Sequence, residues 1–255
     1  MKKTLSLIFA LLVIIGTFSC AFTSGAVFDS GTLTKDLHSD IYYMENLDEG
    51  TVFFEKNSQK KTPAAAFVKT LAAVVALEKW GNLEGDIKVT KKNLSLIDYE
   101  YGVRVAGYKE GETVSKRELF DCLVIYSAND AASIIASEIS GSVAAFVKEM
   151  QALADKIGCT STAVKNIHGF DQDGQYTTAQ DVAKIIKYAL NYPVFAEAFS
   201  AKTITLKATE LNEERTYNAS NKMVNATIAD YYHSSVTGGK QTATDKAGEC
   251  IAVVS

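Results

Sequence analysis

The stretch "TPAAAFVKTLAAVVALEKWG", residues 62–81, decides how this chain folds. It is apolar on nearly every side and therefore predicts a helix buried within a core. Thr62 is a suitable N-cap and Pro63 suits the first helical position. Residue 66 should then lie in the first turn, where backbone N–H groups lack helical partners. One cation, Lys69, interrupts the apolar run inside the second turn.

Lys69 lies one turn after residue 66, so the two share a face of the predicted helix, with about 5–6 Å between their Cβ atoms. An amine among Ala, Val, Leu and Phe is desolvated, which lowers its pKa and suits it to act as a base. Positive potential at the helix N-terminus acts in the same direction. The alternative is that Lys69 extends along the helix surface to water. This segment alone does not decide between the two.

The rest of the chain alternates between strand and helix patterns. Apolar alternation over 41–44 and 51–55, on either side of turn residues 46–50, predicts a β-hairpin. Helices are expected over 115–126, 129–139, 142–157 and 178–190, and strands over 202–207 and 250–254. Strands toward both ends with helices between them predict an α/β (α+β) domain in which the terminal strands share one sheet.

Length and composition set the class of protein. The chain has 255 residues, of which 47 % are hydrophobic and 22 % charged, enough to bury a core. Residues 1–26 contain two lysines, an apolar run from Leu5 to Ile15 and then small residues, the pattern of a secretory signal peptide. The apolar run is too short for a membrane span. We expect a secreted or extracytoplasmic protein with one domain over 27–255 and no membrane span in the mature chain.

Charge and cysteine usage exclude several partners. Removing residues 1–26 takes away two lysines and no acids, which leaves 24 basic against 30 acidic residues. Nucleic acid is therefore not an expected partner. Cys122, Cys159 and Cys250 lie far apart without C-x-x-C spacing, which argues against a disulfide framework and against zinc. The histidines are also scattered, so we expect no metal and no cofactor.

Two further segments give Lys69 a context. "YSANDAA", residues 126–132, places a hydroxyl and an amide two residues apart at the start of an apolar helix. "GGKQTATDKAGECIAVV", residues 238–254, places a lysine just before a predicted edge strand. In this order, the three segments resemble the S-x-x-K, S-x-N and K-T-G motifs of penicillin-binding proteins and serine β-lactamases.

The resemblance is greatest to the D-alanyl-D-alanine carboxypeptidase group of low-molecular-mass penicillin-binding proteins, and it covers about residues 36–255. The segment "NIHGFDQDGQYTTAQDVAKI", residues 166–185, resembles that family's N-x-x-G and Y-T-T-A-x-D stretches, and "NASNKMV" resembles its N-x-N-x-L segment. The implied fold is β-lactamase/penicillin-binding-protein-like: an antiparallel sheet with helices on both faces plus a helical subdomain. That family normally continues beyond the last predicted strand with another strand and a helix, so we expect a C-terminally truncated domain.

The resemblance also implies a chemistry. In the family, a serine attacks the carbonyl between two D-alanines of a peptidoglycan stem peptide and forms an acyl-enzyme, and β-lactams react at the same serine. Two backbone N–H groups hold the oxyanion. Carried over to this sequence, the resemblance implies Lys69 as the base, Ser127 as the proton relay, Asn129 as the contact to the substrate amide, Lys240 as the lysine that binds the terminal carboxylate, and the N–H groups of residue 66 and Ala243 as oxyanion donors.

The sequence departs from the family at the positions that carry this chemistry. The nucleophile position is Ala66, which has no hydroxyl. Gln241 replaces the hydroxyl that meets the carboxylate, and Thr242 places a β-branched side chain where glycine lets substrate lie close to the strand. A literal S-x-x-K over 58–61 lies in a polar connector before Pro63 and is not favoured as the nucleophile. We therefore expect a family member that is catalytically inactive as written.

Two alternatives stay open at this point. The chain could be a non-catalytic cell-wall protein that binds stem peptides or acts as a scaffold for a partner enzyme. It could also be a β-lactamase-like hydrolase, but the alanine at position 66 argues against that reading as strongly as against a carboxypeptidase. A restored serine would make β-lactams expected ligands.

Overall fold

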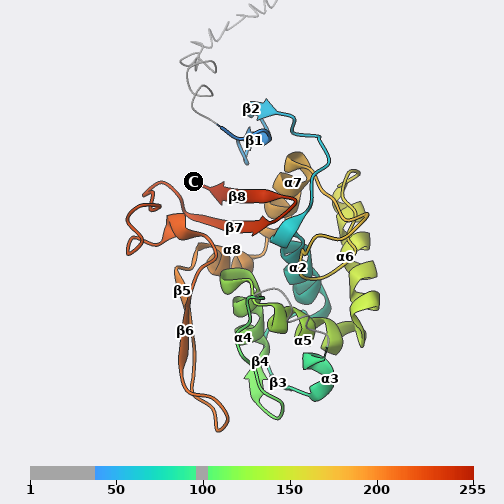
Figure 1. Ribbon diagram of the computed structural model, residues 1–255, viewed down its shortest axis with the longest axis vertical. Helices are drawn as coiled ribbons and strands as arrows, with labels where there is room; N and C mark the ends of the chain where they lie inside the picture. The colour runs from blue at the N-terminus through green and yellow to red at the C-terminus, as the bar shows by residue number, and fades with distance from the viewer. Residues whose placement is uncertain (1–37, 96–102) are drawn as a thin grey trace, which may run out of the picture. The chain divides into compact units, whose positions relative to one another are not determined.

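The computed structural model describes residues 38–95 and 103–255, and Figure 1 shows their arrangement. The predicted signal peptide over 1–26 lies outside the described residues. The helices are η1 (Ala65–Phe67), α2 (Val68–Trp80), α3 (Lys91–Leu94), α4 (Lys116–Asp121), η2 (Cys122–Tyr126), α5 (Asn129–Ser140), α6 (Val143–Ile157), α7 (Ala179–Ala189), α8 (Pro193–Ser200) and η3 (Lys222–Val224). The strands are β1 (Tyr42–Glu45), β2 (Val52–Lys56), β3 (Asp86–Lys88), β4 (Thr113–Ser115), β5 (Thr203–Leu206), β6 (Arg215–Asn218), β7 (Gly238–Thr244) and β8 (Gly248–Val254).

Helix α2 is the core helix that its sequence predicts. Every residue from Val68 to Leu77 is buried, Lys69 included. Helices α5, α6 and α7 all contact α2 (Figure 1). A helix that is apolar on all sides is stable only when other elements surround it, and this packing buries it in the main hydrophobic cluster.

The beginning of this helix differs from the prediction. Thr62 is not an N-cap: its N–H and C=O both bond to Thr177 in an isolated antiparallel bridge. The following Pro63 disfavours the helical region for the residue before it, which explains the extended backbone. The first helical turn is instead the 3₁₀ turn η1, which begins at Ala65 and leads directly into α2.

The four helices predicted for the middle of the chain are confirmed within one or two residues at each end, as α4 with η2, α5, α6 and α7. Ser115, Ser142 and Thr178 cap the first, third and fourth of these by accepting a backbone N–H with the side-chain oxygen. One feature was not predicted. After Asp121 the helix widens into a π-helical turn, η2, which ends at Ser127. Such turns are rare and are frequent at functional sites.

The strands pair antiparallel and are mixed with helices, as in the fold that the family resemblance implies, but their pairing is more local than expected. Within the described residues each strand pairs only with its neighbour in sequence, as β1–β2, β3–β4, β5–β6 and β7–β8. The terminal strands therefore do not share hydrogen bonds in one sheet. Except for β3–β4, which are separated by residues 89–112, the pairs form through short loops, for which closing the chain costs least entropy. Lys240 also lies inside β7, and not before the strand as predicted.

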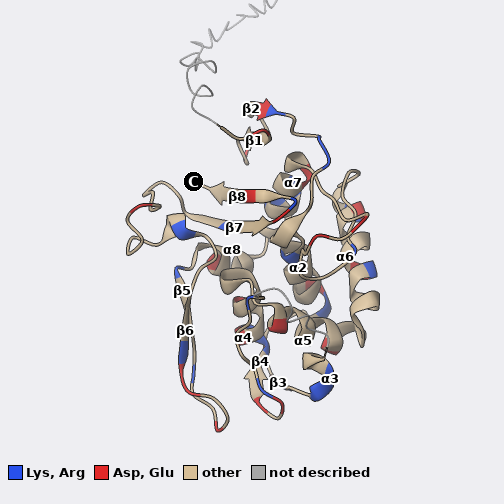
Figure 2. Ribbon diagram, in the orientation of Figure 1, with Lys and Arg blue, Asp and Glu red and all other residues tan. Residues whose placement is uncertain are grey.

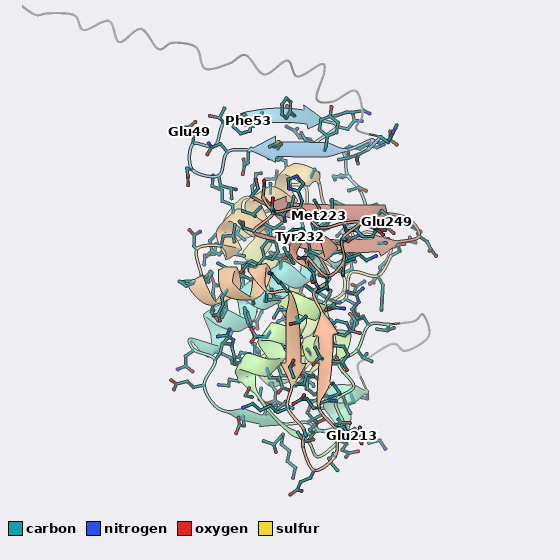
Figure 3. The ribbon with its side chains drawn as sticks, turned by 90° about the vertical axis from the view of Figure 1, so that its left-hand side faces the viewer. Glu49, Phe53, Glu213, Met223, Tyr232 and Glu249 are labelled. Carbon is teal, nitrogen blue, oxygen red and sulfur yellow. The ribbon has the colours of Figure 1, made fainter. Side chains whose placement is uncertain are left out.

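Several short elements have no sequence signal strong enough to predict them. Strands β3 and β4 have three residues each, and the polar strand β6 lacks apolar alternation. Helix α8 begins at Pro193 and packs against β7 through Phe199, whose ring lies beside Gly238. Figure 2 shows acidic residues on the loop that joins β5 to β6, where Figure 3 places Glu213.

Some large apolar side chains are exposed, among them Phe53 on β2 and Tyr232 in the segment before β7 (Figure 3). Among the described residues, no single helix combines the length and the apolar composition that a membrane span needs; α5 and α6 reach it only as a pair bent by 89°.

Candidate active site

The site begins at a strained turn. Ala65 has φ +45°, a left-handed value that is costly for a residue with a Cβ. Its neighbour Ala66 is half-buried and opens the helix that carries Lys69. The residue before Ala65 is helical, so the strain is confined to one peptide. Strain of this kind persists where the surrounding structure enforces it, and it clusters at functional sites.

Lys69 points into the protein, and not along the helix surface to water. Its Nζ atom lies 2.6 Å from the carbonyl oxygen of Ser127 and 3.2 Å from its hydroxyl, so the amine donates to both. The residue is only 4 % exposed. Burial lowers the pKa of Lys69 well below its ordinary value; the nearby cations Lys240 and Arg104 act in the same direction, and Asp130 opposes them.

Ser127 is placed by the widened turn before it. The π-helical turn η2 ends with Ser127 in the left-handed conformation, at φ +67°. Ala128 is extended, and α5 begins at Asn129, so only Ala128 separates the residue with the hydroxyl from the residue with the amide. The Asn129 backbone N–H donates to Arg104 O at 2.9 Å. Its buried side-chain Oδ1 has no hydrogen-bond partner among the described residues.

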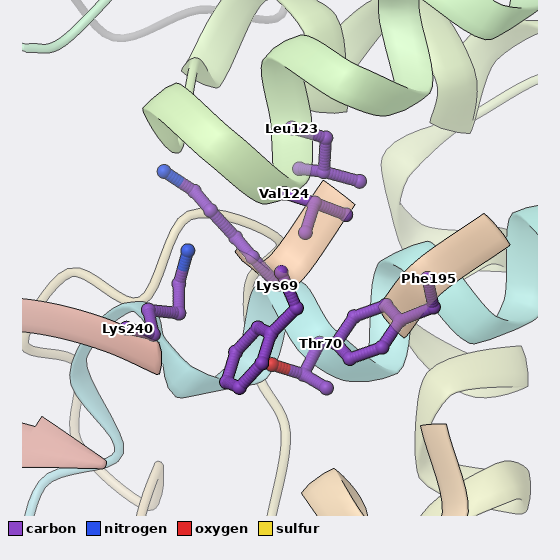
Figure 4. Close-up of a pocket in the computed structure, with 7 residues that line it drawn as sticks. Lys69, Thr70, Leu123, Val124, Phe195 and Lys240 are labelled. Atoms are coloured by element: carbon purple, nitrogen blue, oxygen red, sulfur yellow. The ribbon is translucent and has the colours of Figure 1, made fainter. Parts of the chain in front are cut away.

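Strand β7 forms the opposite side of the site. Because side chains alternate along a strand, Lys240, Thr242 and Thr244 share one face. Lys240 is 3 % exposed and lines a narrow, partly open pocket together with Lys69, Thr70, Leu123, Val124, Phe195 and Phe199. Figure 4 shows the side chains of Lys69 and Lys240 extending toward the same side of this pocket. Two positions along the strand, the hydroxyl of Thr242 accepts a hydrogen bond from the backbone N–H of Ala66 at 3.2 Å.

Three basic side chains, Lys69, Lys240 and Arg104, interact electrostatically at the site. Burial, reinforced by Arg104, lowers the pKa of Lys240 to about 7. No hydrogen bond of the Lys240 amine is found within the described residues. Arg104 is held over the ring of Tyr126, with its Cζ atom 5.3 Å from the ring centroid, and donates to Tyr126 O at 3.2 Å. Asp130, the carboxylate that opposes the lowering of the Lys69 pKa, accepts four backbone N–H bonds.

The structure thus brings Ala66, Lys69, Ser127 and Lys240 to one site, with Asn129 two residues after Ser127. The remaining predicted residues lie on the other face of β7: Gln241 is half-buried opposite Ile251, and Ala243 is exposed opposite Glu249. Their roles stay predictions. The literal S-x-x-K over 58–61 is engaged elsewhere: Ser58 donates to Glu55, and the Lys61 amine lies over the ring of Tyr176.

The sequence did not predict the roles of three residues at this site, Asp130, Arg104 and Thr242. Asp130 follows Asn129 directly and, as an acidic residue in the first turn of a helix, carried a signal that could have been noticed. Arg104 lies in a loop without periodicity and gave no signal. Thr242 was recognised for its bulk, but its bond to Ala66 joins residues 176 positions apart and no local pattern encodes it.

Comparison with known proteins identifies the family of this chain. A family model described as D-alanyl-D-alanine carboxypeptidase matches residues 29–255. The chain belongs to the D-alanyl-D-alanine carboxypeptidase family. Its similarity to D-alanyl-D-alanine carboxypeptidase DacF of Bacillus subtilis is 31 % identity over 149 residues, which is 57 % of this chain and 37 % of that protein. With DacB2 of Mycobacterium tuberculosis, identity is 32 % over 158 residues, 61 % of this chain and 52 % of that protein.

Solved structures of this fold are also similar. A D-alanyl-D-alanine carboxypeptidase from Mycobacterium tuberculosis H37Rv superposes with a TM-score of 0.72 at 25 % identity, over 84 % of this chain and 76 % of that one. The Streptomyces K15 DD-transpeptidase superposes with a TM-score of 0.74 at 22 % identity, over 84 % of this chain and 82 % of that one. This second likeness shows the penicillin-binding-protein fold. The matched stretches span about half or less of the two curated carboxypeptidases.

Proposed function

We propose that this member of the carboxypeptidase family is catalytically inactive, acts outside the cytoplasm at the cell wall, and binds peptidoglycan stem peptides that end in D-Ala-D-Ala without cleaving them. The observation that carries the proposal is the methyl group of Ala66 in front of an otherwise assembled Lys69–Ser127 pair. An acyl-enzyme needs a nucleophilic atom at that position. Loss of the nucleophile in a serine hydrolase lowers turnover by roughly 10⁶.

Retained binding groups support the second part of the proposal. Lys240 and Lys69 are buried, close to Arg104, and receive little compensation from anions. A carboxylate that enters the site relieves this repulsion, because charges attract strongly where water is excluded. The unpartnered Oδ1 of Asn129 is an acceptor for a peptide N–H. A peptide with a free terminal carboxylate satisfies both requirements.

Inactivity is tested by labelling with fluorescent penicillin. We expect no covalently labelled band for the chain as it stands, and a stable band for the triple variant Ala66→Ser, Gln241→Thr, Thr242→Gly. That variant restores the nucleophile together with both altered positions of the third motif. A stable labelled band for the unaltered chain would overturn the claim of inactivity.

Binding is tested by calorimetric titration with a diacetyl-lysyl-D-Ala-D-Ala peptide. We expect saturable heat at millimolar peptide, no heat with the same peptide amidated at its C-terminus, and loss of binding in Lys240→Met. The exposed Lys202→Met is the matched control and should bind as the parent does. Absence of heat at millimolar peptide would remove the binding function.

A further inference from the structure

The backbone N–H of Ala66 already has an acceptor inside the chain, and that acceptor is a side chain of the facing strand. As a first-turn N–H group it has no helical partner, and it donates to the hydroxyl of Thr242 at 3.2 Å. An N–H in this position is free, in an open site, to receive the carbonyl oxygen of a ligand. Here a side chain of the opposite strand fills that place.

The two partners are held against each other by a common loop. Gly169 packs directly against the carbonyl of Ala65, next to Ala66. Two residues later, the Asp171 carboxylate accepts from the Thr244 hydroxyl at 2.8 Å and from the Lys246 N–H at 2.9 Å. The loop therefore fixes both the turn that presents the N–H group and the end of the strand that presents the hydroxyl.

Thr242 itself has little freedom to leave. It is half-buried and pairs with Cys250 in an uninterrupted antiparallel ladder, so its backbone is fixed by β8. A β-branched side chain also has few χ1 rotamers available within a strand. The neighbouring Lys240, on the same face, lines the pocket beside Lys69, and the N–H of Ala66 bonds to Thr242.

We propose that the Thr242 hydroxyl is an internal ligand, or cap, of the Ala66 N–H, so that this donor is withheld from the carbonyl group of a ligand. The inference rests on the proposed function and deepens it. A ligand is selected by its carboxylate end, and the carbonyl of a peptide or a β-lactam gains the Ala66 N–H only by displacing the threonine hydroxyl. Thr242 is in this sense a specificity-determining residue.

The effect on affinity has the size of one neutral hydrogen bond. Such a bond contributes about 0.5–1.5 kcal/mol net, and tenfold in affinity is 1.4 kcal/mol. Removing the internal hydroxyl should therefore raise affinity for a carbonyl-containing ligand roughly two- to tenfold. Where a restored serine makes the same N–H stabilise an oxyanion, one such donor is worth about 10²–10³ in rate.

The cap is tested directly by the amide signal of Ala66 in ¹⁵N-labelled protein. Thr242→Ser and Thr242→Ala are a matched pair, because they differ only in the hydroxyl oxygen. We expect the Ala66 amide proton to keep its parental chemical shift and slow exchange in Thr242→Ser, and to move upfield and exchange at least threefold faster in Thr242→Ala. An unchanged signal in Thr242→Ala overturns the cap, whatever the ligand measurements show.

Ligand measurements on the same pair separate the cap from the proposed function. We expect Thr242→Ala, and not Thr242→Ser, to bind the diacetyl-lysyl-D-Ala-D-Ala peptide roughly two- to tenfold more tightly than the parent. If the Ala66 amide responds but no variant binds peptide, the cap stands and the peptide-binding function fails. Tighter binding by both variants alike would assign the effect to bulk and overturn the role of the hydroxyl.

A covalent readout completes the test. In the Ala66→Ser background, adding Thr242→Ala should accelerate labelling by fluorescent penicillin by about 10² or more, whereas adding Thr242→Ser should not. Equal labelling rates in the two double variants would contradict the cap. This comparison needs no affinity for the stem peptide, so it holds even where the parent binds none.

Discussion

Gly169 packs so closely against Ala65 that a Cβ atom at position 169 would overlap the Ala65 carbonyl oxygen. The glycine has φ +89°, and its own N–H donates to Asn166 Oδ1 at 2.7 Å. Asn166 and Gly169 are the first and last residues of the N-x-x-G segment, and this hydrogen bond closes the turn that places Gly169 against η1. The left-handed Ala65 and its neighbour Ala66 are therefore held in place by a loop from a distant part of the chain.

Gly169→Ala should be strongly destabilising and should also displace the Ala66 turn. Gly174→Ala is the matched control, since Gly174 has φ +79° but its nearest neighbour is the flexible end of Lys165. Both variants carry the left-handed penalty of roughly 1–2 kcal/mol, and only Gly169→Ala adds a clash with backbone. We expect its free energy of unfolding in urea to fall by at least about 2 kcal/mol more than that of the control. Equal losses would contradict this packing.

Asp130 ties a loop to the start of α5. Its Oδ1 accepts from the N–H groups of Ala106 and Ala131, both at 2.9 Å, and its Oδ2 from Gly107 at 2.8 Å and Tyr108 at 3.3 Å. The loop it holds begins just after Arg104, one of the three cations of the site. Because the carboxylate has no free lone pair to spare in this buried position, the loop depends on its charge.

Asp130→Asn should therefore lower the free energy of unfolding by about 3 kcal/mol. The amide offers one acceptor oxygen in place of two, and its NH₂ group faces the two backbone N–H groups that the other oxygen accepted. Hydrogen bonds to charged groups contribute about 1.5–3 kcal/mol each. Asp173→Asn, at a fully exposed side chain, is the control and should change stability by less than about 0.5 kcal/mol. Denaturant titration of the two variants side by side checks the prediction; similar stabilities would show that the loop is held by other contacts.

Local sequence predicted the parts of this site that lie within one element. The apolar helix around Lys69 follows from its sequence, although that segment alone also allowed the amine to extend to water, and the placement of Ser127 and Asn129 at the start of α5 follows from their spacing. Thr62 was assigned wrongly because its polar side chain suits an N-cap, while the Pro63 that follows favours an extended backbone. Residues that meet across the fold gave no such signal: Arg104 and the Thr242 hydroxyl act through contacts that only tertiary packing creates.

Apart from the hairpin β1–β2, which strands pair with each other could not be predicted from the sequence. The sequence shows apolar strands near both ends, and family resemblance suggested one sheet, but hydrogen bonding along a strand depends on which edge lies beside it. Strands β1 and β8 each bond to their hairpin partner within the described residues. Which side chains share a face of a strand can still be predicted, because the alternation follows from strand geometry alone. It places Lys240 and Thr242 on one face of β7.

Lys240 makes stability depend on pH in a defined direction. Burial lowers the pKa of its amine to about 7 in the folded chain, while an unfolded lysine titrates near 10.4. Below pH 7 both states are protonated, so the folded state bears the whole cost of a buried charge. Between about pH 7 and 10 the unfolded state binds more protons, and stability rises with pH by up to about 1.4 kcal/mol per unit from this group.

Lys240→Met removes that dependence, because the thioether carries no charge in either state. We expect the variant to be more stable than the parent at pH 6.5, and the difference to shrink by at least about 1 kcal/mol by pH 9, as the parent loses its buried charge. The exposed Lys202→Met should show a difference from the parent that does not vary with pH. The free energy of unfolding in urea, measured for the three proteins at both pH values, tests this prediction. If Lys240→Met is more stable than the parent by the same amount at both pH values, the Lys240 amine keeps an ordinary pKa and is not desolvated beside Lys69.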